Sequence, residues 1–272
     1  MVAQSSNEEF SKIENEEFSK IEGPLKNVEI ADPTKVFRGM NYGEWAAVRW
    51  NYVLSARPDN YYDPGRGMIF LRGSIDAVYY DPDPLKRIYS GQTIDNRIKI
   101  SEDTAVLLPI ITTTFVIDDT YQGVTMKDEI SLRNSARQDT VNGGDLFARI
   151  KVKPDNKIHQ LVDNLNNYVV ETPYFPLYVD ENAPYKDMMD GKFEPGPHYA
   201  VSVGVYVIIS KLPKGTYRLE FGGKGVGRYF THSIYDIEVI DSLPLLNDIS
   251  AKGKSMMARW NNFSPVKKPP WE

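Results

Sequence analysis

The stretch YAVSVGVYVII, residues 199–209, decides the fold class of this 272-residue chain. It is a continuous apolar run, far shorter than the roughly 20 residues that a membrane span needs, so it predicts a buried strand. After a turn at LPKG, 212–215, residues 216–221 alternate between polar and apolar. The apolar set is Tyr217, Leu219 and Phe221, and the polar set is Thr216, Arg218 and Glu220. This period of two predicts a strand with one face in a core and the other in water.

Further strands are expected along the chain. β-branched and aromatic residues are concentrated at 68–72, 105–111, 112–117 and 146–152, and apolar alternation returns at 235–239. Residues 167–179 predict two extended pieces, broken at Pro173 and Pro176. Because no helical crossover separates the late strands, we predict a mainly β protein, a single antiparallel β-sandwich with jelly-roll-like connections.

A helix at 42–55 is expected to pack across this sandwich. It places Trp45, Val48 and Tyr52 on one side, with Arg49 near the centre of the apolar arc. Such an arginine either buries its stem and stacks on an aromatic ring, or it meets an anion or a sugar at the sandwich edge. We expect Arg49 to hold the helix to the sheet, and we keep Trp45, Arg49 and Tyr52 as candidate ligand-binding residues.

The N-terminus contains a tandem repeat, in which NEEFSKIE occupies 7–14 and again 15–22. A helix there would carry a narrow apolar stripe made of Phe10, Ile13, Phe18 and Ile21. The stripe either packs on the body of the same chain or docks on a neighbouring subunit, which would make 7–22 a homo-oligomer contact.

These patterns divide the chain into three parts. The first is a helical N-terminal arm at 1–24, and the second is the β-sandwich domain at 36–241, which includes a second helix at 126–138. The third is a C-terminal extension at 242–272, which ends in KKPPWE and is expected to be extended there.

Composition excludes several classes of function. The net charge of −5 gives no electrostatic footprint for nucleic acid, and no apolar run is long enough to predict a membrane span. The absence of cysteine excludes disulfides, thiolate metal ligands and cysteine nucleophiles. The opening MVAQSS lacks the basic and apolar regions of an export signal.

The order of segments resembles a scattered, uncharacterised prokaryotic family of mostly exported proteins. The resemblance rests on the Trp-rich helix ending in L-S-x-x-P, on IFLRGS and LLPIIT, and on GVYVIISKLPKGTYRLEFGG followed by FTHSIYDIEVI. Relatives carry a W-x(3)-W-W-x-W helix, a V-W-F-L-x-G strand and a terminal G-Y-Y-x-L-L-x-P-L-x-P-G-x-H-x-I-x-F-x-G pattern. Arg49 and Tyr52 stand where relatives have tryptophan, Tyr217 stands where they often have histidine, and their cysteines are missing. The resemblance implies a β-rich fold and export, and it implies no activity.

Few motifs carry recognisable chemistry. G-x-S-x-G, H-E-x-x-H and P-loop patterns are absent, and GGKGVGR, 222–228, predicts a hairpin loop because its spacing does not fit a phosphate site. If their strands pair, His198 and His232 could hold zinc with Glu194; otherwise His198 is a loop residue and His232 a hydrogen-bonded sheet residue.

The acidic stretches YDPDP, 80–84, and IDDTY, 117–121, could supply calcium ligands, although Asp-Pro also forms turns. We therefore predict no cofactor, with calcium and zinc as open alternatives, and we add His198 and His232 to the candidate ligand-binding residues.

Three classes of function stay open. The first is a ligand-binding β-sandwich for a small molecule or carbohydrate, favoured by the abundant tyrosine, whose rings stack on sugars. The second is a hydrolase or lyase that uses acidic residues with His198 or His232. The third is a structural or oligomer-forming protein joined through its N-terminal arm. An extracytoplasmic location is expected from the resemblance, with a cytoplasmic location as the alternative.

Overall fold

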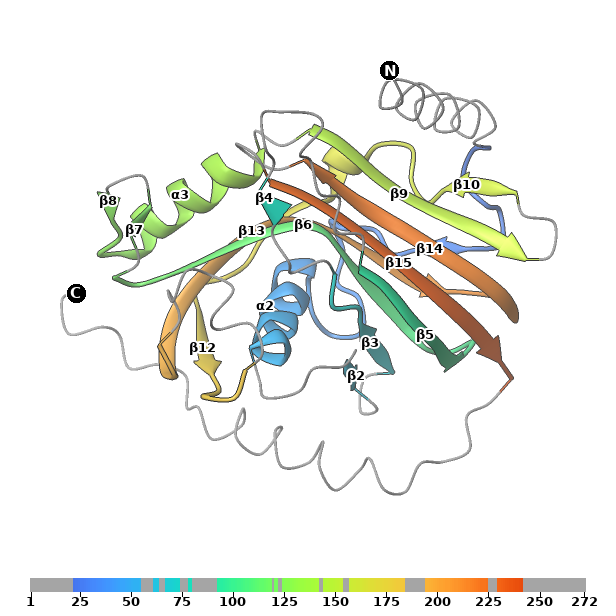
Figure 1. Ribbon diagram of the computed structural model, residues 1–272, viewed down its shortest axis with the longest axis horizontal. Coiled ribbons are helices and arrows are strands. Elements are labelled where there is room, and N and C mark those ends of the chain that lie inside the picture. The colour runs from blue at the N-terminus through green and yellow to red at the C-terminus, as the bar shows by residue number, and fades with distance from the viewer. Residues whose placement is uncertain are drawn as a thin grey trace, which may run out of the picture.

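The chain folds mainly into strands, arranged in two mixed sheets with few helices (Figure 1). The computed structural model describes residues 22–54, 61–63, 67–73, 78–79, 92–118, 120–121, 124–141, 144–153, 157–183, 194–224 and 229–241. The tandem repeat up to residue 21, the YDPDP stretch and the extension at 242–272 lie outside these residues, and so do the predictions made for them.

The seven-stranded sheet is built around β13, Gly196–Lys211, which contains the apolar run. β13 pairs antiparallel with β6 (Ala105–Val116), β1 (Glu29–Ile30), β11 (Val169–Glu171) and β12 (Phe175–Val179). β6 pairs parallel with β3 (Met68–Phe70), and β3 pairs antiparallel with β2 (Tyr61–Asp63). The two strands predicted at 105–111 and 112–117 are therefore one long strand.

The six-stranded sheet has the order β10 (Ile158–Gln160), β9 (Gly144–Lys153), β14 (Gly215–Lys224), β15 (Tyr229–Ile240) and β4 (Val78–Tyr79). β5 (Gln92–Ser101) pairs parallel with β15. A separate hairpin joins β7 (Thr120–Tyr121) and β8 (Val124–Thr125).

Two expectations about the sheets are corrected. The sheets are mixed rather than purely antiparallel, because β3 and β5 each run parallel to a neighbour. The glycines at 222 and 223 belong to β14 instead of a hairpin loop. The strand at 216–221 follows β13 directly in the chain but lies in the other sheet, so the LPKG segment leads from one sheet to the other.

The long apolar run is explained by burial of β13 on both faces. Val205, Val207 and Ile209 belong to the core shared with the six-stranded sheet, where Leu219 and Ile237 lie. Tyr206 and Ile208, on the opposite face, pack with the first helix instead. A strand covered on both faces has no position for a polar residue that reaches water, so it loses the polar alternation that β14 keeps.

The helix α2, Tyr42–Val53, covers the outer face of the seven-stranded sheet, as expected, and Figure 1 shows it beside β3 and β12. A capping box starts it: Asn41 Oδ1 accepts from the Glu44 N–H (2.9 Å), and Glu44 Oε2 accepts from the Asn41 N–H (2.7 Å).

The helix α3, Glu129–Val141, begins three residues later than the predicted 126–138. It packs Leu132 and Ala136 against Phe115, Val201 and Val203, beyond the end of the six-stranded sheet. One 3₁₀ turn, η2, spans Leu165–Tyr168.

Candidate functional site

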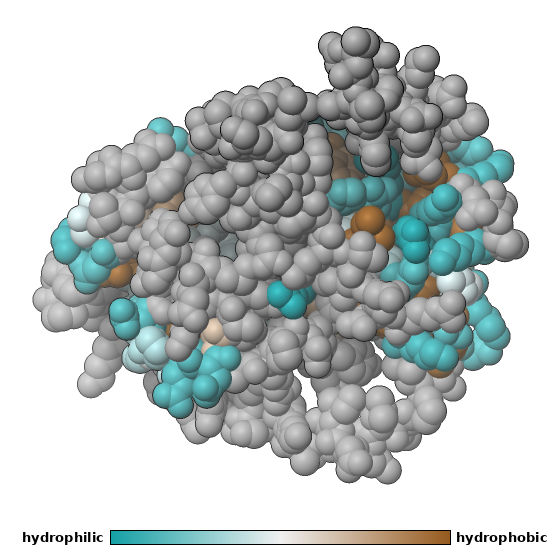
Figure 2. Space-filling model, in the orientation of Figure 1, coloured by the Kyte–Doolittle hydropathy of each residue, from teal (hydrophilic) through white to brown (hydrophobic). Residues whose placement is uncertain are grey.

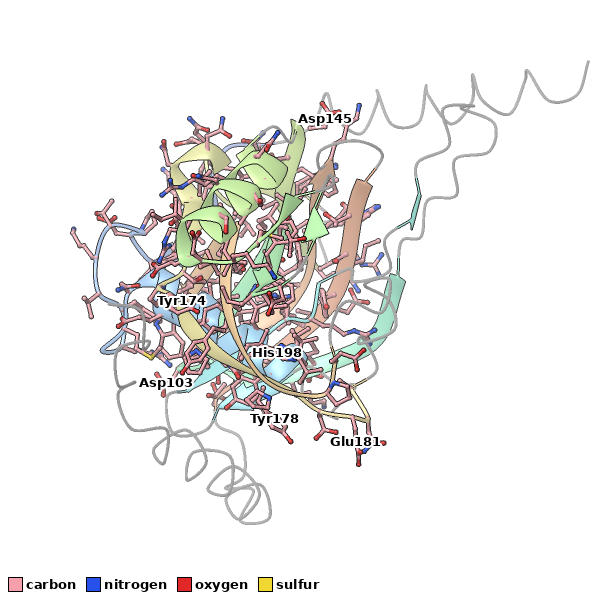
Figure 3. All side chains as sticks on the ribbon, turned by 90° about the vertical axis from the view of Figure 1, so that its left-hand side faces the viewer. Asp103, Asp145, Tyr174, Tyr178, Glu181 and His198 are labelled. Carbon is pink, nitrogen blue, oxygen red and sulfur yellow. The ribbon has the colours of Figure 1, made fainter. Side chains whose placement is uncertain are left out.

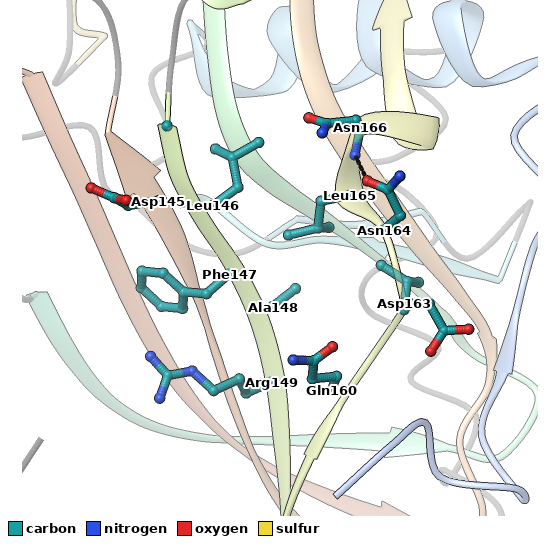
Figure 4. A pocket seen from close by; sticks show the side chains of 12 residues that line it. Asp145, Leu146, Phe147, Ala148, Arg149, Gln160, Asp163, Asn164, Leu165 and Asn166 are labelled. Atoms are coloured by element: carbon teal, nitrogen blue, oxygen red, sulfur yellow. Dashed lines mark hydrogen bonds between the residues drawn. The ribbon is translucent and has the colours of Figure 1, made fainter. Parts of the chain in front are cut away.

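A pocket of about 490 Å³ lies between β9 and the segment 160–166 (Figure 4). Its apolar lining comes from Leu146, Ala148, Val162 and Leu165. Its other lining residues are Gly144, Asp145, Phe147 and Arg149 of β9, and Gln160, Asp163, Asn164 and Asn166 of the opposite segment. The volume falls in the range of small-molecule sites, and carboxylates and amides combined with apolar side chains suit a small ligand rich in hydroxyl groups.

The alternation of β9 places these residues. Figure 4 shows that Leu146 and Ala148 extend from β9 toward Leu165, whereas Phe147 and Arg149 extend to the other side. The segment opposite is held in place by the Leu161 N–H, which donates to the Ala148 carbonyl oxygen (2.9 Å).

Two local features shape the polar lining. Asn164 caps η2, because its Oδ1 accepts from the Asn166 N–H (3.0 Å), and this fixes the turn that carries both amides. Asp145 has a φ of 52°, in the left-handed region that non-glycine residues rarely adopt. Aspartate tolerates this region better than most residues do, and the conformation turns the chain at the entrance to β9.

A second group of side chains lies on the opposite face of β9. His232 Nε2 donates to Glu220 Oε1 (2.7 Å), and the ring of Phe147 meets His232 edge to face, with centroids 5.4 Å apart. The Arg149 guanidinium lies 4.7 Å from the centroid of the Phe147 ring. We call these four residues, Phe147, Arg149, Glu220 and His232, the His232 cluster.

Strand register explains why these residues meet. Gly222 of β14 is the register partner of Phe147 in β9 and of His232 in β15, so the three form one row across the sheet. Glycine leaves the space between the two rings open. A Cβ at Gly222 would lie 1.9 Å from the Thr231 carbonyl oxygen, so this position has no room for a side chain.

The charges of the cluster favour an ionised carboxylate. Burial by itself would raise the pKa of Glu220, but the hydrogen bond from His232 and the positive charge of Arg149 outweigh it and hold the pKa below its usual range. The side chains of His232 and Glu220 are 26% and 28% exposed, so a partly exposed imidazole and a carboxylate face the same side of the sheet. Figure 2 shows the described surface in the region of this sheet as mainly polar with small apolar areas.

The residues predicted on α2 lie elsewhere. Trp45 is fully buried, and its Nε1 donates to the Phe37 carbonyl oxygen (2.9 Å). Tyr52 is partly buried and stacks on Phe70, with ring centroids 5.1 Å apart. Neither ring belongs to the pocket or to the His232 cluster.

Arg49 lies in the interior, with 2% of its surface exposed. Its Nη2 donates to the Arg72 carbonyl oxygen (2.5 Å), just after β3, and its Cζ lies 5.1 Å from the centroid of the Trp50 ring. The hydrogen bond connects α2 to the segment that follows β3, which is the structural role expected for Arg49, whereas the contact with Trp50 lies within the helix.

The two histidines do not converge by strand pairing. His198 lies in β13, in the seven-stranded sheet, and its Nε2 donates to the Glu194 carbonyl oxygen (2.6 Å). His232 lies in β15, in the six-stranded sheet, so the pairing that a shared zinc site required is absent. Within the described part of the chain, no group of three or more His, Asp or Glu side chains is placed to hold a metal ion. Asp118 of the IDDTY stretch pairs with Lys127 (2.5 Å).

Sequence reasoning found His232 but missed its partners. The alternation at 216–221 did place Glu220 on the solvent-facing side of its strand. The pattern of 146–152 is compatible with Phe147 and Arg149 on the solvent-facing side of theirs. Only the register between β9, β14 and β15 shows that these residues are neighbours.

Comparisons with known proteins give no match. No family model, no curated protein and no solved structure matches the chain. The resemblance to the prokaryotic family therefore stays a prediction. Among the described residues, no helix is long and apolar enough to cross a bilayer.

Proposed function

We propose that the protein binds a small polyhydroxylated ligand of the carbohydrate class in the pocket beside β9. The observation that carries the proposal is the composition of that pocket, in which apolar side chains on one strand face two asparagines and an aspartate on the opposite segment. A sugar ring has an apolar face and a rim of hydroxyl groups, which matches such a lining.

The test compares two neighbouring asparagines. Asn166 lines the pocket, while Asn167, also exposed and on the same 3₁₀ turn, does not. The wild-type chain is first screened against neutral mono- and disaccharides by thermal shift, because a ligand raises the stability of the state that it binds. Isothermal titration of any hit should then show binding lost in Asn166→Trp and kept in Asn167→Trp. Equal binding by both variants, or no hit in the panel, would count against the proposal.

A second function is favoured by the His232 cluster. A hydrolase or lyase needs a general base within reach of a substrate, and a carboxylate that orients an imidazole is a common way to supply one. In this alternative, the Glu220 carboxylate positions the His232 imidazole, and the imidazole acts as the general base that removes a proton from the substrate or from the attacking water. Nitrophenyl esters and glycosides should then be turned over by the wild-type chain and not by His232→Gln, whereas His198→Gln, in the other sheet, should keep full activity.

The proposal also covers the N-terminal arm, the order of the strands and the cellular location of the protein. We infer a helical arm at 1–24 and a jelly-roll order of strands in an extracytoplasmic protein, with the family resemblance as support for the location. For packing of the arm on its own chain, the supporting contact is at Glu22, which is extended and forms a parallel β-bridge with His159; its N–H donates to the Ile158 carbonyl oxygen (2.9 Å). The Gln160 N–H donates back to the Glu22 carbonyl oxygen (3.0 Å), and Gln160 lines the pocket. Cell fractionation of the native host would test the location.

A further inference from the structure

Tyrosines and prolines form a surface along β12 and the first residues of β13. We call it the Tyr–Pro surface, and it consists of Tyr174, Pro176, Tyr178, Pro197 and Tyr199. In the register of the two strands, Pro176 is opposite Tyr199, and Tyr178 is opposite Pro197. The rings of Tyr174 and Tyr199 stack with their centroids 5.1 Å apart. Figure 3 views this side of the molecule, with Tyr174 and Tyr178 labelled.

The fold itself does not account for this surface. The alternate residues of β12, namely Phe175, Leu177 and Val179, are the ones that are buried, and they pack in the core cluster that contains Trp50. Tyr178 and Tyr199 are 46% and 37% exposed, which makes them two of the few large apolar side chains that are exposed in the described part of the chain. Prolines protect the edge of a sheet from pairing with another strand, but they do not require exposed tyrosines beside them.

Alternating tyrosine and proline rings suit a ligand of one kind. Polyproline II segments bind to aromatic surfaces, because their backbone is already extended and their proline rings pack flat on aromatic faces. The tyrosine hydroxyl groups at the rim of such a surface can donate to the exposed carbonyl oxygens of the segment.

The charges beside the surface favour a basic segment. Asp180 and Glu181 follow β12 directly, and Glu194 lies two residues before β13. Burial is the main reason why the pKa of Tyr174 is raised, and the neighbouring Tyr199 and the negative charge of Glu129, which pairs with Arg133, add to it. A partner with lysines next to its prolines would meet complementary charge here.

The chain itself contains such a segment. Residues 265–271 read PVKKPPW, with three prolines, two lysines and a tryptophan. The last described strand ends at Ile240, so about 24 residues separate it from Pro265, and an extended chain of that length spans on the order of 80 Å. This exceeds the diameter of a domain of this size. We propose that the Tyr–Pro surface binds residues 265–271 of the same chain. The proposal is independent of the pocket beside β9, which lies in the other sheet.

The experiment uses the full chain. Because the chain has no cysteine, Glu272→Cys creates a unique site for a nitroxide label next to the segment. The label should broaden the amide resonances of Tyr178 and Tyr199 and leave those of Val239, in the other sheet, sharp. Pro269→Ala combined with Pro270→Ala should restore the broadened resonances to at least about half of their unlabelled intensity, because these substitutions weaken polyproline II structure. Val266→Ala, within the same segment, is the matched control and should leave the broadening in place.

Three results would overturn the proposal. The first is the absence of broadening at Tyr178 and Tyr199. The second is broadening that appears only when labelled and isotope-enriched chains are mixed, because the segment would then come from a second copy. The third is a chemical shift change at both tyrosines on adding a neutral oligosaccharide such as maltohexaose, with no effect of the nitroxide, because the surface would then be a sugar site.

Discussion

The hydrogen bond between His232 and Glu220 makes a quantitative prediction about stability. Hydrogen bonds to charged groups contribute about 1.5–3 kcal/mol, whereas fully exposed ion pairs contribute about 0.2–1 kcal/mol. Both side chains are roughly a quarter exposed, and His232 Nε2 lies 2.7 Å from Glu220 Oε1. The contribution of this pair should therefore lie between the values for a buried charged hydrogen bond and for a fully exposed ion pair. We expect a coupling energy of about 1–2 kcal/mol at pH 7.

A double-mutant cycle measures this coupling energy directly. The free energy of unfolding is obtained by urea denaturation for the wild type, Glu220→Gln, His232→Gln and the double variant. The matched control is the pair of Lys99 and Glu238, which lies in the same sheet, with 57% and 35% of the two side chains exposed and 3.1 Å between their charged atoms. Its cycle should give less than about 1 kcal/mol.

The pH dependence follows from the lowered pKa of Glu220. A carboxyl whose pKa is lower in the folded state stabilises the fold fully above its unfolded-state pKa, about 4.3, and loses that contribution as the pH falls through the folded-state value. The wild type should therefore lose its advantage over Glu220→Gln as the pH falls below about 4. A coupling energy below about 0.3 kcal/mol at pH 7, or an advantage that persists undiminished at pH 2, would refute the reasoning.

Three further predictions concern other parts of the molecule. Arg49→Met keeps the buried stem but removes the donor to the Arg72 carbonyl oxygen, and it should lower the free energy of unfolding by about 1–3 kcal/mol in urea denaturation; an unchanged midpoint would contradict the role given to Arg49. Gly222→Ala should cost about 1–3 kcal/mol because the new Cβ meets the Thr231 carbonyl oxygen, whereas Gly23→Ala, which meets no atom within 4 Å, should be near neutral in the same assay. Deletion of residues 1–21 should lower the mass in light scattering to one chain if the arm joins subunits, and it should lower only the melting temperature if the arm packs on its own body; no change in either would make the arm prediction wrong.

The strands were largely predictable because their patterns depend on burial alone. Residues 216–221 and 235–239 alternate in the structure as they do in the sequence, with Tyr217, Tyr235 and Ile237 among the buried residues. The apolar run at 199–209 was recognised as a buried strand for the same reason. The α2 helix was predictable from the arc of apolar residues that packs on the sheet.

The assignment of strands to sheets was not predictable in the same way. The chain passes through LPKG with a turn that would suit a hairpin, yet β13 and β14 belong to different sheets. A turn sequence constrains the local backbone only, and it does not specify whether the next strand pairs with the previous one or crosses the core. The parallel pairs β3–β6 and β5–β15 escaped prediction for a related reason, since they join segments that lie far apart in the sequence.

The position of both candidate sites follows from which sheet faces remain accessible. Most of β13 and β6 is covered on one side by the six-stranded sheet and α3 and on the other by α2, so these side chains are used for packing, while Pro197 and Tyr199 at the start of β13 are exposed. The described outer face of the six-stranded sheet instead carries charged pairs, such as Arg218 with Asp236 and Glu220 with His232. β9 lies between this face and the pocket, and its alternation sends Ala148 to the pocket and Phe147 to the His232 cluster. A change of register of one residue in β9 would exchange these two sets, so any ligand chemistry on either side depends on the pairing of β9 with β14.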